Sequence, residues 1–337
     1  MKWRLQCWLV LAGGGMVGAL IAFSVIELQT SEFQAAQLAA FARKLYFIPK
    51  PGPSRAIRFP AAGPYDKRLG YSDLPRFLKR LDATGFRIEA QARFSPALLR
   101  VAKWGLFPTY REKDQAGLEI LDRRGDRLFV HVYPQHVYKE FNAVPPLVVG
   151  TLLAIENREL LDPRYPKRNP AVEWDRLFKA AVEYPQWVLH NDTKGPGGST
   201  LATQLEKARH SAEGLTKSPL EKLRQMASAS LRAYLDGEET LEAQEQVIVH
   251  YLNSLPLAAV PGQGEVIGLA AGLDAWFGAD FRRVNRLLRA RTRDVDISAR
   301  ALGYKQVLCL LLAQRRPTDF LVKSPQSLLK LTDAYLR

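Results

Sequence analysis

The segment at 197–210, GGSTLATQLEKARH, carries the side chains best suited to chemistry. Its glycines permit a tight turn, and Ser199 is predicted to cap the helix that follows. Four polar residues then recur at helical spacing on one face: Thr200, Thr203, Gln204 and Lys207. Hydroxyls, an amide and an ammonium group at a helix N-terminus predict a site for a phosphate or a sugar. A merely solvated helix face is the alternative.

A carboxylate and a second basic helix complete the candidate chemistry. Glu156 ends the apolar run LLAIE, so it is predicted to be partly buried and suited to general acid or base work. A surface or capping glutamate is the alternative. A further helix is predicted to begin at SPLE, with Ser218 as N-cap, Pro219 at its first position and Glu221 completing a capping box. The basic residues of this stretch are Lys207, Arg209, Lys217, Lys222 and Arg224.

An apolar run near the start predicts the compartment. Residues 7–26 contain no charge, and ~20 helical residues span ~30 Å, enough for a bilayer core. Lys2 and Arg4 precede the run, which places the N-terminus in the cytoplasm and the rest across the membrane. A cleaved signal peptide is the alternative, but its apolar region is usually shorter and no clean A-x-A site follows the run. Gly14 and Gly18 form a weak helix-pairing pattern.

Composition limits the partners. The 48 Lys and Arg against 34 Asp and Glu give a net charge of +14, and 47% hydrophobic residues exclude general disorder. A basic surface suits nucleic acid, anionic lipid or an anionic substrate, and the predicted anchor argues against nucleic acid. Two cysteines exclude a disulfide-dense scaffold.

The elements that must position these residues change in character along the chain. A helix is predicted over 28–48, a linker or extended strand over 49–64, a helix over 72–86 and a strand over 87–94. Two strands are predicted within 117–133. From Pro145 onward the pattern is helical, and no strand-rich stretch is predicted there. The sequence therefore predicts a mainly α protein with a small α+β region before the helical domain.

Five segments in order resemble the motifs of glycosyltransferase family 51, the peptidoglycan glycosyltransferase domain of class A penicillin-binding proteins and monofunctional transglycosylases. The segments are Glu156-Asn157-Arg158, GGSTLATQLEK, EKLRQMASASL, HYLNS at 250–254 and GEVIGLAAGLDAWFG at 264–278. The resemblance covers about residues 117–337. It implies a lysozyme-like, two-lobed fold with a cleft beside the membrane.

The resemblance also implies a reaction. The family polymerises lipid II into glycan strands and releases undecaprenyl pyrophosphate. Glu156 matches its catalytic base. The residues expected to bind pyrophosphate or sugar are Ser199, Thr200, Gln204, Lys207, Lys217, Lys222, Gln225 and Asn253. Cations there would stabilise the leaving pyrophosphate. Family members often use a divalent metal such as Mg²⁺; no organic cofactor is expected. The expected partners are lipid II, the nascent glycan strand, the cytoplasmic membrane and other proteins of cell-wall synthesis.

Several positions depart from the family pattern. Asn157 stands for the usual Asp, and Gln225 replaces the second glutamate, which weakens the case for a metal. The other departures are Leu160, Ala202, Ala208 and Val249. A divergent but active enzyme is expected. The alternatives are a non-catalytic protein that binds lipid II or glycan and a lysozyme-like hydrolase that uses Glu156 as an acid.

The predicted organisation has four parts. They are a cytoplasmic N-terminus at 1–6, a transmembrane helix at 7–26, a juxtamembrane and α+β accessory region at 27–115, and the glycosyltransferase domain at 116–337. The aromatic residues of the insert at 162–196 (Tyr165, Trp174, Tyr184 and Trp187) are expected either at the membrane surface or in ordinary packing. Ser327-Leu-Leu-Lys330 matches a transpeptidase motif by chance, and the helical character of LTDAYLR is compatible with a longer natural protein.

Overall fold

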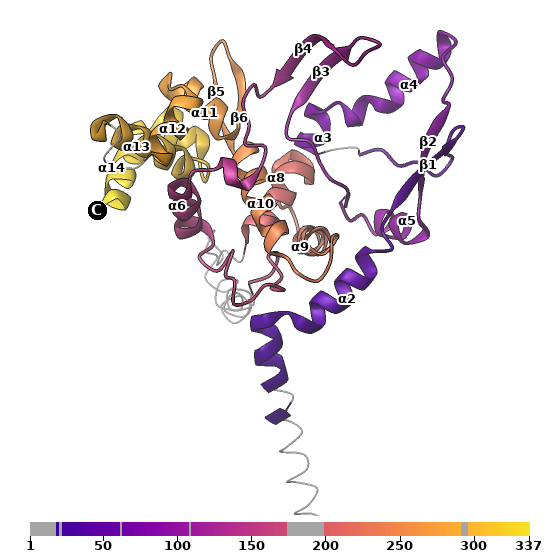
Figure 1. Cartoon of the computed structure of the whole chain (residues 1–337), viewed down its shortest axis with the longest axis horizontal. Coiled ribbons are helices and arrows are strands. Elements are labelled where there is room, and N and C mark those ends of the chain that lie inside the picture. Colours follow the sequence, from indigo (N-terminus) through magenta and orange to yellow (C-terminus); the bar gives the residue numbers. More distant parts are fainter. Residues whose placement is uncertain (1–17, 20–21, 61–62, 108, 174–198, 291–295) are drawn as a thin grey trace, which may run out of the picture.

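The structure is a computed structural model that describes residues 18–19, 22–60, 63–107, 109–173, 199–290 and 296–337 (Figure 1). Helices dominate the described residues, and the strands are short and paired in twos, which confirms the mainly α prediction. None of the helices in these ranges is both long and apolar enough to cross a bilayer. Most of the predicted span at 7–26 lies outside the described residues, so that span stays a prediction.

Two helical segments lead from the N-terminal side into the body. Residues 22–30 are helical. The helix is interrupted at Ser31, whose φ of 57° is left-handed, and α2 (Glu32–Ala42) begins after it. The carboxylate of Glu27 spans the break and accepts hydrogen bonds from the first free amides of α2, at 2.8 Å each. Ala35 and Ala39 of α2 are fully buried against Ala233 and Tyr234.

The accessory region is a small α+β unit, as predicted. Its elements are β1 (Phe47–Pro51), α3 (Pro64–Arg68), a 3₁₀ turn (Tyr71–Asp73), α4 (Leu74–Ala83), β2 (Ala90–Phe94) and α5 (Pro96–Lys103). β1 pairs antiparallel with β2, from Phe47 opposite Phe94 to Pro51 opposite Ala90. The start of the predicted linker at 49–64 is therefore an extended strand.

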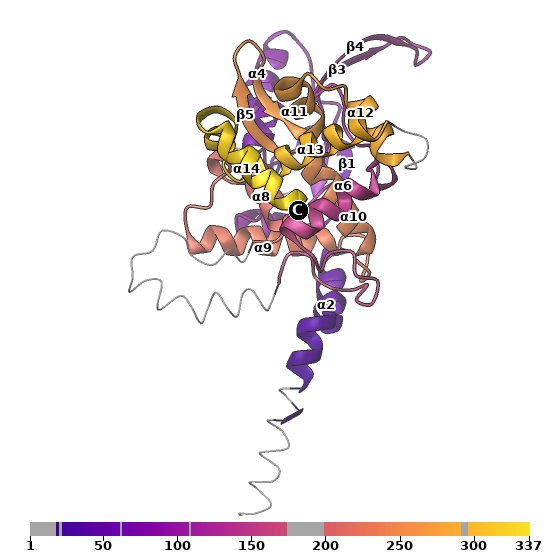
Figure 2. The ribbon, with the colours of Figure 1, turned by 90° about the vertical axis from the view of Figure 1, so that its left-hand side faces the viewer.

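A hairpin connects this unit to the helical domain. β3 (Ala116–Leu121) pairs antiparallel with β4 (Arg127–Tyr133), which confirms the two strands predicted there. Figures 1 and 2 show the hairpin and α4 at the end of the molecule opposite residues 22–42.

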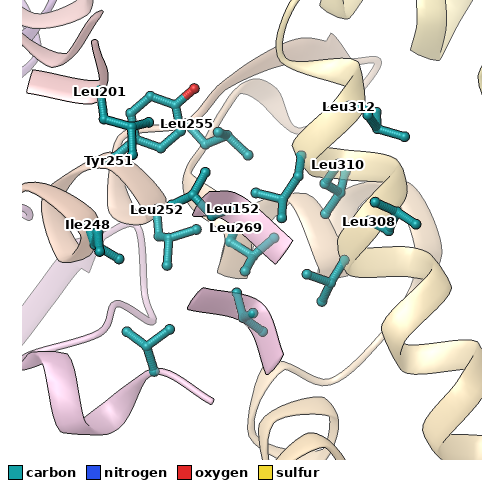
Figure 3. Close-up of a cluster of buried hydrophobic side chains, with 14 of the residues drawn as sticks. Leu152, Leu201, Ile248, Tyr251, Leu252, Leu255, Leu269, Leu308, Leu310 and Leu312 are labelled. Carbon is teal, nitrogen blue, oxygen red and sulfur yellow. The ribbon is translucent and has the colours of Figure 1, made fainter. Parts of the chain in front are cut away.

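The helical domain surrounds one large core. Its elements are a 3₁₀ turn (Phe141–Ala143), α6 (Pro146–Glu156), α8 (Leu201–His210), a 3₁₀ turn (Ala212–Gly214), α9 (Pro219–Ala233), α10 (Leu241–Asn253), β5 (Pro256–Val260), β6 (Gly264–Ile267), α11 (Gly268–Phe277), α12 (Phe281–Arg289), α13 (Ile297–Ala313), a π-helical turn (Thr318–Lys323) and α14 (Pro325–Leu336). Figure 3 shows leucine, isoleucine and tyrosine side chains of this core, from α6, α8, α10, α11 and α13, converging. Burial of this apolar surface is the main force that holds these helices together.

The expectation that no strand-rich stretch follows residue 145 misses one short hairpin. β5 and β6 form a short antiparallel hairpin within a run that reads as apolar and glycine-rich. Short apolar runs do not distinguish strand from helix by periodicity. The hairpin ends at Gly268, where φ is 84° and an added Cβ would lie 2.6 Å from the backbone oxygen of Asn253. Only glycine fits this turn into α11.

Candidate active site

Glu156 is the last residue of α6. The helix ends because Asn157 adopts an extended conformation (φ −159°), and the Asn157 side chain accepts a hydrogen bond from the backbone amide of Glu159 at 3.3 Å. Glu156 is 9% exposed, which confirms the predicted burial. A carboxylate at a helix C-terminus faces the negative end of the helix dipole, so its position requires nearby donors.

Among the described residues, Gln204, Gln314 and Arg315 donate to Glu156. Oε2 accepts from the amide of Gln204 at 3.1 Å. Oε1 accepts from the amide of Gln314 and from Nε of Arg315, each at 3.1 Å. Arg315 also donates to the carbonyl oxygen of Ile155 at 3.1 Å, so one guanidinium compensates both the helix end and the carboxylate. An ion pair with arginine involves the ionised carboxylate, which is the form that can accept a proton.

Gln204 connects Glu156 to the protein interior. Its amide oxygen accepts a hydrogen bond of 3.4 Å from the hydroxyl of Tyr251 in α10. Burial raises the pKa of Tyr251 well above 10, so this hydroxyl stays protonated and remains a donor. With its oxygen accepting from Tyr251, the Gln204 amide presents its nitrogen to the carboxylate.

The start of α8 differs by one residue from the prediction. Thr200, not Ser199, is the N-cap: its hydroxyl accepts from the amide of Thr203, and the Thr203 hydroxyl accepts from the amide of Thr200. Thr200 and Thr203 are fully or almost fully buried. The two threonine hydroxyls therefore cap the helix, and their predicted part in a cradle for a sugar or phosphate stays a prediction. Ser199 instead accepts a hydrogen bond from Lys222 Nζ at 2.7 Å.

Two partly buried lysines follow: Lys207 interacts electrostatically with Glu156, and Lys222 interacts with Lys207. Burial lowers the pKa of Lys207 from 10.5, and the charge of Glu156 opposes this shift. Burial, and then repulsion from Lys207, lower the pKa of Lys222 to about 8. Two mutually repelling, desolvated ammonium groups favour an anion between them, which is the electrostatic requirement of a phosphate site.

Lys217 does not join this pair. Its side chain is half exposed and forms a salt bridge with Glu213 at 3.1 Å. The predicted cap of α9 is correct for Ser218, which accepts from the amide of Glu221. The Glu221 carboxylate accepts from the amide of Lys217 at 2.9 Å, one residue before the cap.

Gln225 occupies a closed polar pocket. Its side chain is completely buried, and its amide nitrogen donates to the hydroxyls of Ser211 and Thr216 at 2.8 and 2.9 Å. Within the described ranges, no group of three His, Cys, Asp or Glu side chains could hold a metal ion. The donor set around Gln225 therefore does not fit Mg²⁺, which prefers carboxylate oxygens.

Asn253 makes internal contacts. Its amide donates to Asp114 Oδ2 and to the carbonyl oxygen of Tyr138, each at 2.7 Å, and its oxygen accepts from the amide of Tyr138 at 2.8 Å. These bonds satisfy the Asn253 side chain within the protein. They tie α10 to the segment before α6.

The departures from the family pattern follow packing. Leu160, Ala202 and Val249 are all buried in the main core. A polar or charged side chain at these positions would need a buried partner. The predicted aromatic contacts of Trp174, Tyr184 and Trp187 with a membrane lie outside the described residues.

Gln314 and Arg315 were missed from the sequence. They follow α13, 158 and 159 residues from Glu156, and no motif marks them. The QRR run after a long apolar helix was the one available signal. A cavity of about 270 Å³ lies elsewhere, and Arg209, Arg232 and His250 are among its lining residues.

A buried carboxylate and two partly buried lysines therefore stand on a mainly helical domain. The transglycosylase family model matches residues 126–336, more than half of the chain. The chain therefore belongs to the transglycosylases of glycosyltransferase family 51. The comparison with curated proteins gave no match.

Proposed function

We propose that this chain is a membrane-anchored peptidoglycan glycosyltransferase that polymerises lipid II into glycan strands. The observation that carries the proposal is the position of Glu156, which accepts hydrogen bonds from Gln204 and Arg315 and interacts electrostatically with Lys207, which in turn interacts with Lys222. In the family, a two-lobed lysozyme-like domain places such a site in a cleft beside the membrane.

The proposed reaction assigns one role to each group. Glu156 takes the proton of the acceptor sugar hydroxyl while that oxygen attacks the anomeric carbon of the growing chain. The bond from the anomeric carbon to the pyrophosphate oxygen breaks, and undecaprenyl pyrophosphate leaves. Lys207 and Lys222 stabilise the negative charge that develops on the leaving group. No step passes through a metal, because the residues around Gln225 do not fit one.

The arrangement of the elements supports a lipid-linked substrate. α2 packs against the last turn of α9, the helix that carries Lys222 near its start (Figure 2). Leu215, Leu220 and Leu223 near the start of α9 are more than half exposed. Exposed leucines next to lysines suit the surface of an anionic bilayer. We place the protein in the cytoplasmic membrane, with the domain on the outer side and other cell-wall synthesis proteins as partners.

The decisive experiment is polymerisation of labelled lipid II by the detergent-solubilised protein, with Glu156→Gln alongside. Long strands from the wild type and none from the variant, with lipid II binding retained by both, would support the proposal. Equal rates would remove Glu156 from the mechanism. No product from either protein, with saturable binding that weakens in Lys207→Ala, would instead support a non-catalytic binding protein. Glycan release from purified sacculi would support a hydrolase.

A further inference from the structure

Residues 110–114 bring two acidic side chains into the helical domain, and we call them the acidic segment. This segment precedes β3 and lies outside the family match at 126–336. Its Glu112 side chain is 2% exposed and contacts Arg209 at 2.8 Å, His210 at 2.6 Å and Arg232 at 3.0 Å. One carboxylate from the accessory side thus neutralises cations on both α8 and α9.

Asp114 extends the contact to α10. Its Oδ1 lies 2.6 Å from the Arg209 guanidinium and 2.7 Å from Nδ1 of His250, and its Oδ2 accepts from Asn253. Burial alone would raise the pKa of Asp114, but the bond from His250 and the charge of Arg209 outweigh burial and lower it. Asp114 is therefore ionised and binds two helices.

Glu112 is held in the same way. Burial opposes its ionisation, but the positive charges of Arg232, His210 and Arg209 keep the pKa of its carboxyl well below 4.5. Removing one partner of such a buried group leaves an uncompensated charge. Glu112, Arg209 and Arg232 line the cavity of about 270 Å³. The elements are therefore held together here by ion pairs and not by close apolar packing.

α8 has two functional sides. Gln204 and Lys207 face Glu156, whereas Arg209 is rotated by about 140° from Gln204 around the helix axis. The described contacts of α8 run along its length: Leu201 and Ala202 pack in the main core, Gln204 donates to Glu156, Glu206 pairs with Arg232 of α9, and Arg209 and His210 at the last turn pair with the acidic segment. A ten-residue helix is marginal by itself, so its rotation depends on such contacts.

We propose that Glu112 and Asp114 are positioning residues for the reaction. By holding Arg209 and His210, they fix the rotation of α8 and with it the contact between Gln204 and Glu156. This inference rests on the proposed function, since it assigns the acidic segment to the same site. The acidic segment then belongs structurally to the helical domain, because it holds the helix that carries Gln204.

The test uses the full chain with Glu112→Gln and Asp114→Asn. We expect kcat to fall by about tenfold to a hundredfold while KM for lipid II changes little. Hydrogen exchange should accelerate in residues 201–210 and stay unchanged in α13. Asp114→Asn leaves the Glu112 ion pairs intact. If Glu112→Gln does not fold, kcat and hydrogen exchange are therefore compared between Asp114→Asn and the wild type.

Two controls separate positioning from stability. Arg111→Gln changes an exposed side chain of the same segment and should match the wild type. Leu288→Ala removes buried volume in α12 and should lower the melting temperature without lowering kcat. A kcat loss no greater than that of Leu288→Ala, or unchanged exchange in α8, would overturn the inference. If the wild type proves inactive, the proposed function fails. Hydrogen exchange in residues 201–210 of the variants then shows by itself whether the acidic segment holds α8 in place.

Discussion

The amide nitrogen of Gln204 lies 3.1 Å from Oε2 of Glu156, and the oxygen of the same amide accepts from Tyr251. This hydrogen-bond chain gives the carboxylate a fixed orientation relative to α8 and α10. A general base works only when its lone pair points at the proton it takes. The orientation of Glu156 is therefore set by Gln204 on α8, by Tyr251 on α10 behind it, and by the Gln314 and Arg315 side chains that follow α13.

Replacing Gln204 by Met should lower turnover while lipid II binding is largely retained. A hydrogen bond to a charged group contributes roughly 1.5–3 kcal/mol, so a loss of about tenfold to a hundredfold in kcat is expected. Steady-state kinetics measure it. Tyr251→Phe is the control, because it removes only the outer hydroxyl and should have a smaller effect. A Met variant with wild-type kcat would show that Glu156 needs no partner on α8.

Binding of pyrophosphate should weaken as pH rises above about 8. Lys222 has its pKa lowered to about 8, so the protonated form that attracts an anion is lost in this range. Isothermal titration with inorganic pyrophosphate at several pH values measures the decline. Lys222→Arg keeps its charge and serves as the reference, which also corrects for ionisation of pyrophosphate itself. Parallel curves for the two proteins would mean that Lys222 does not bind the anion.

Stability should decline between about pH 6.5 and 9 because of His210. Burial alone would lower the pKa of His210, but Glu112 and Asp66 outweigh it and raise the pKa from 6.5 to about 9. The raised pKa means that the stabilisation is complete below pH 6.5 and is lost as pH rises through about 9, with a size on the order of 3 kcal/mol.

Chemical denaturation at pH 6, 7.5 and 9 measures this decline, and His210→Gln is expected to flatten it. The charged groups around the ring are Asp66, Glu112 and Glu206, and the two arginines bound to Glu112 stay protonated throughout this range. An equally steep decline in the variant would assign the titration to another group.

Gln225→Glu should destabilise the protein and should not create a metal-dependent enzyme. The side chain is completely buried among hydroxyl groups, and a carboxylate lacks the amide N–H groups that donate to Ser211 and Thr216, which costs about 1–3 kcal/mol or more. The destabilisation should be smaller at pH 5 than at pH 8, since burial favours the protonated form.

Thermal melts at both pH values and polymerisation with and without Mg²⁺ check the Gln225 prediction. Gln225→Met is the uncharged control. Higher activity of the glutamate variant with Mg²⁺, at unchanged stability, would show that the amide limits the rate and that the pocket can open to a metal.

Local chemistry was predictable and long-range contacts were not. The apolar run before Glu156 predicted its burial, and SPLE predicted the start of α9. The cap of α8 was misassigned by one residue, because Ser199 and Thr200 carry the same functional group. Arg315 could not be found, since its contact with Glu156 depends on how α13 packs against α6. The domain boundary at 115/116 stays a prediction.

The acidic segment also has a consequence for how this protein can be recombined. The part that the family shares begins at residue 126, whereas the ion pairs that neutralise Arg209 and Arg232 begin at Glu112. A chimera that transplants only the shared part would bury Arg209 in its new host without the carboxylates of Glu112 and Asp114. The smallest part of this protein that can be moved with its ion pairs intact therefore begins before the residues that the family shares.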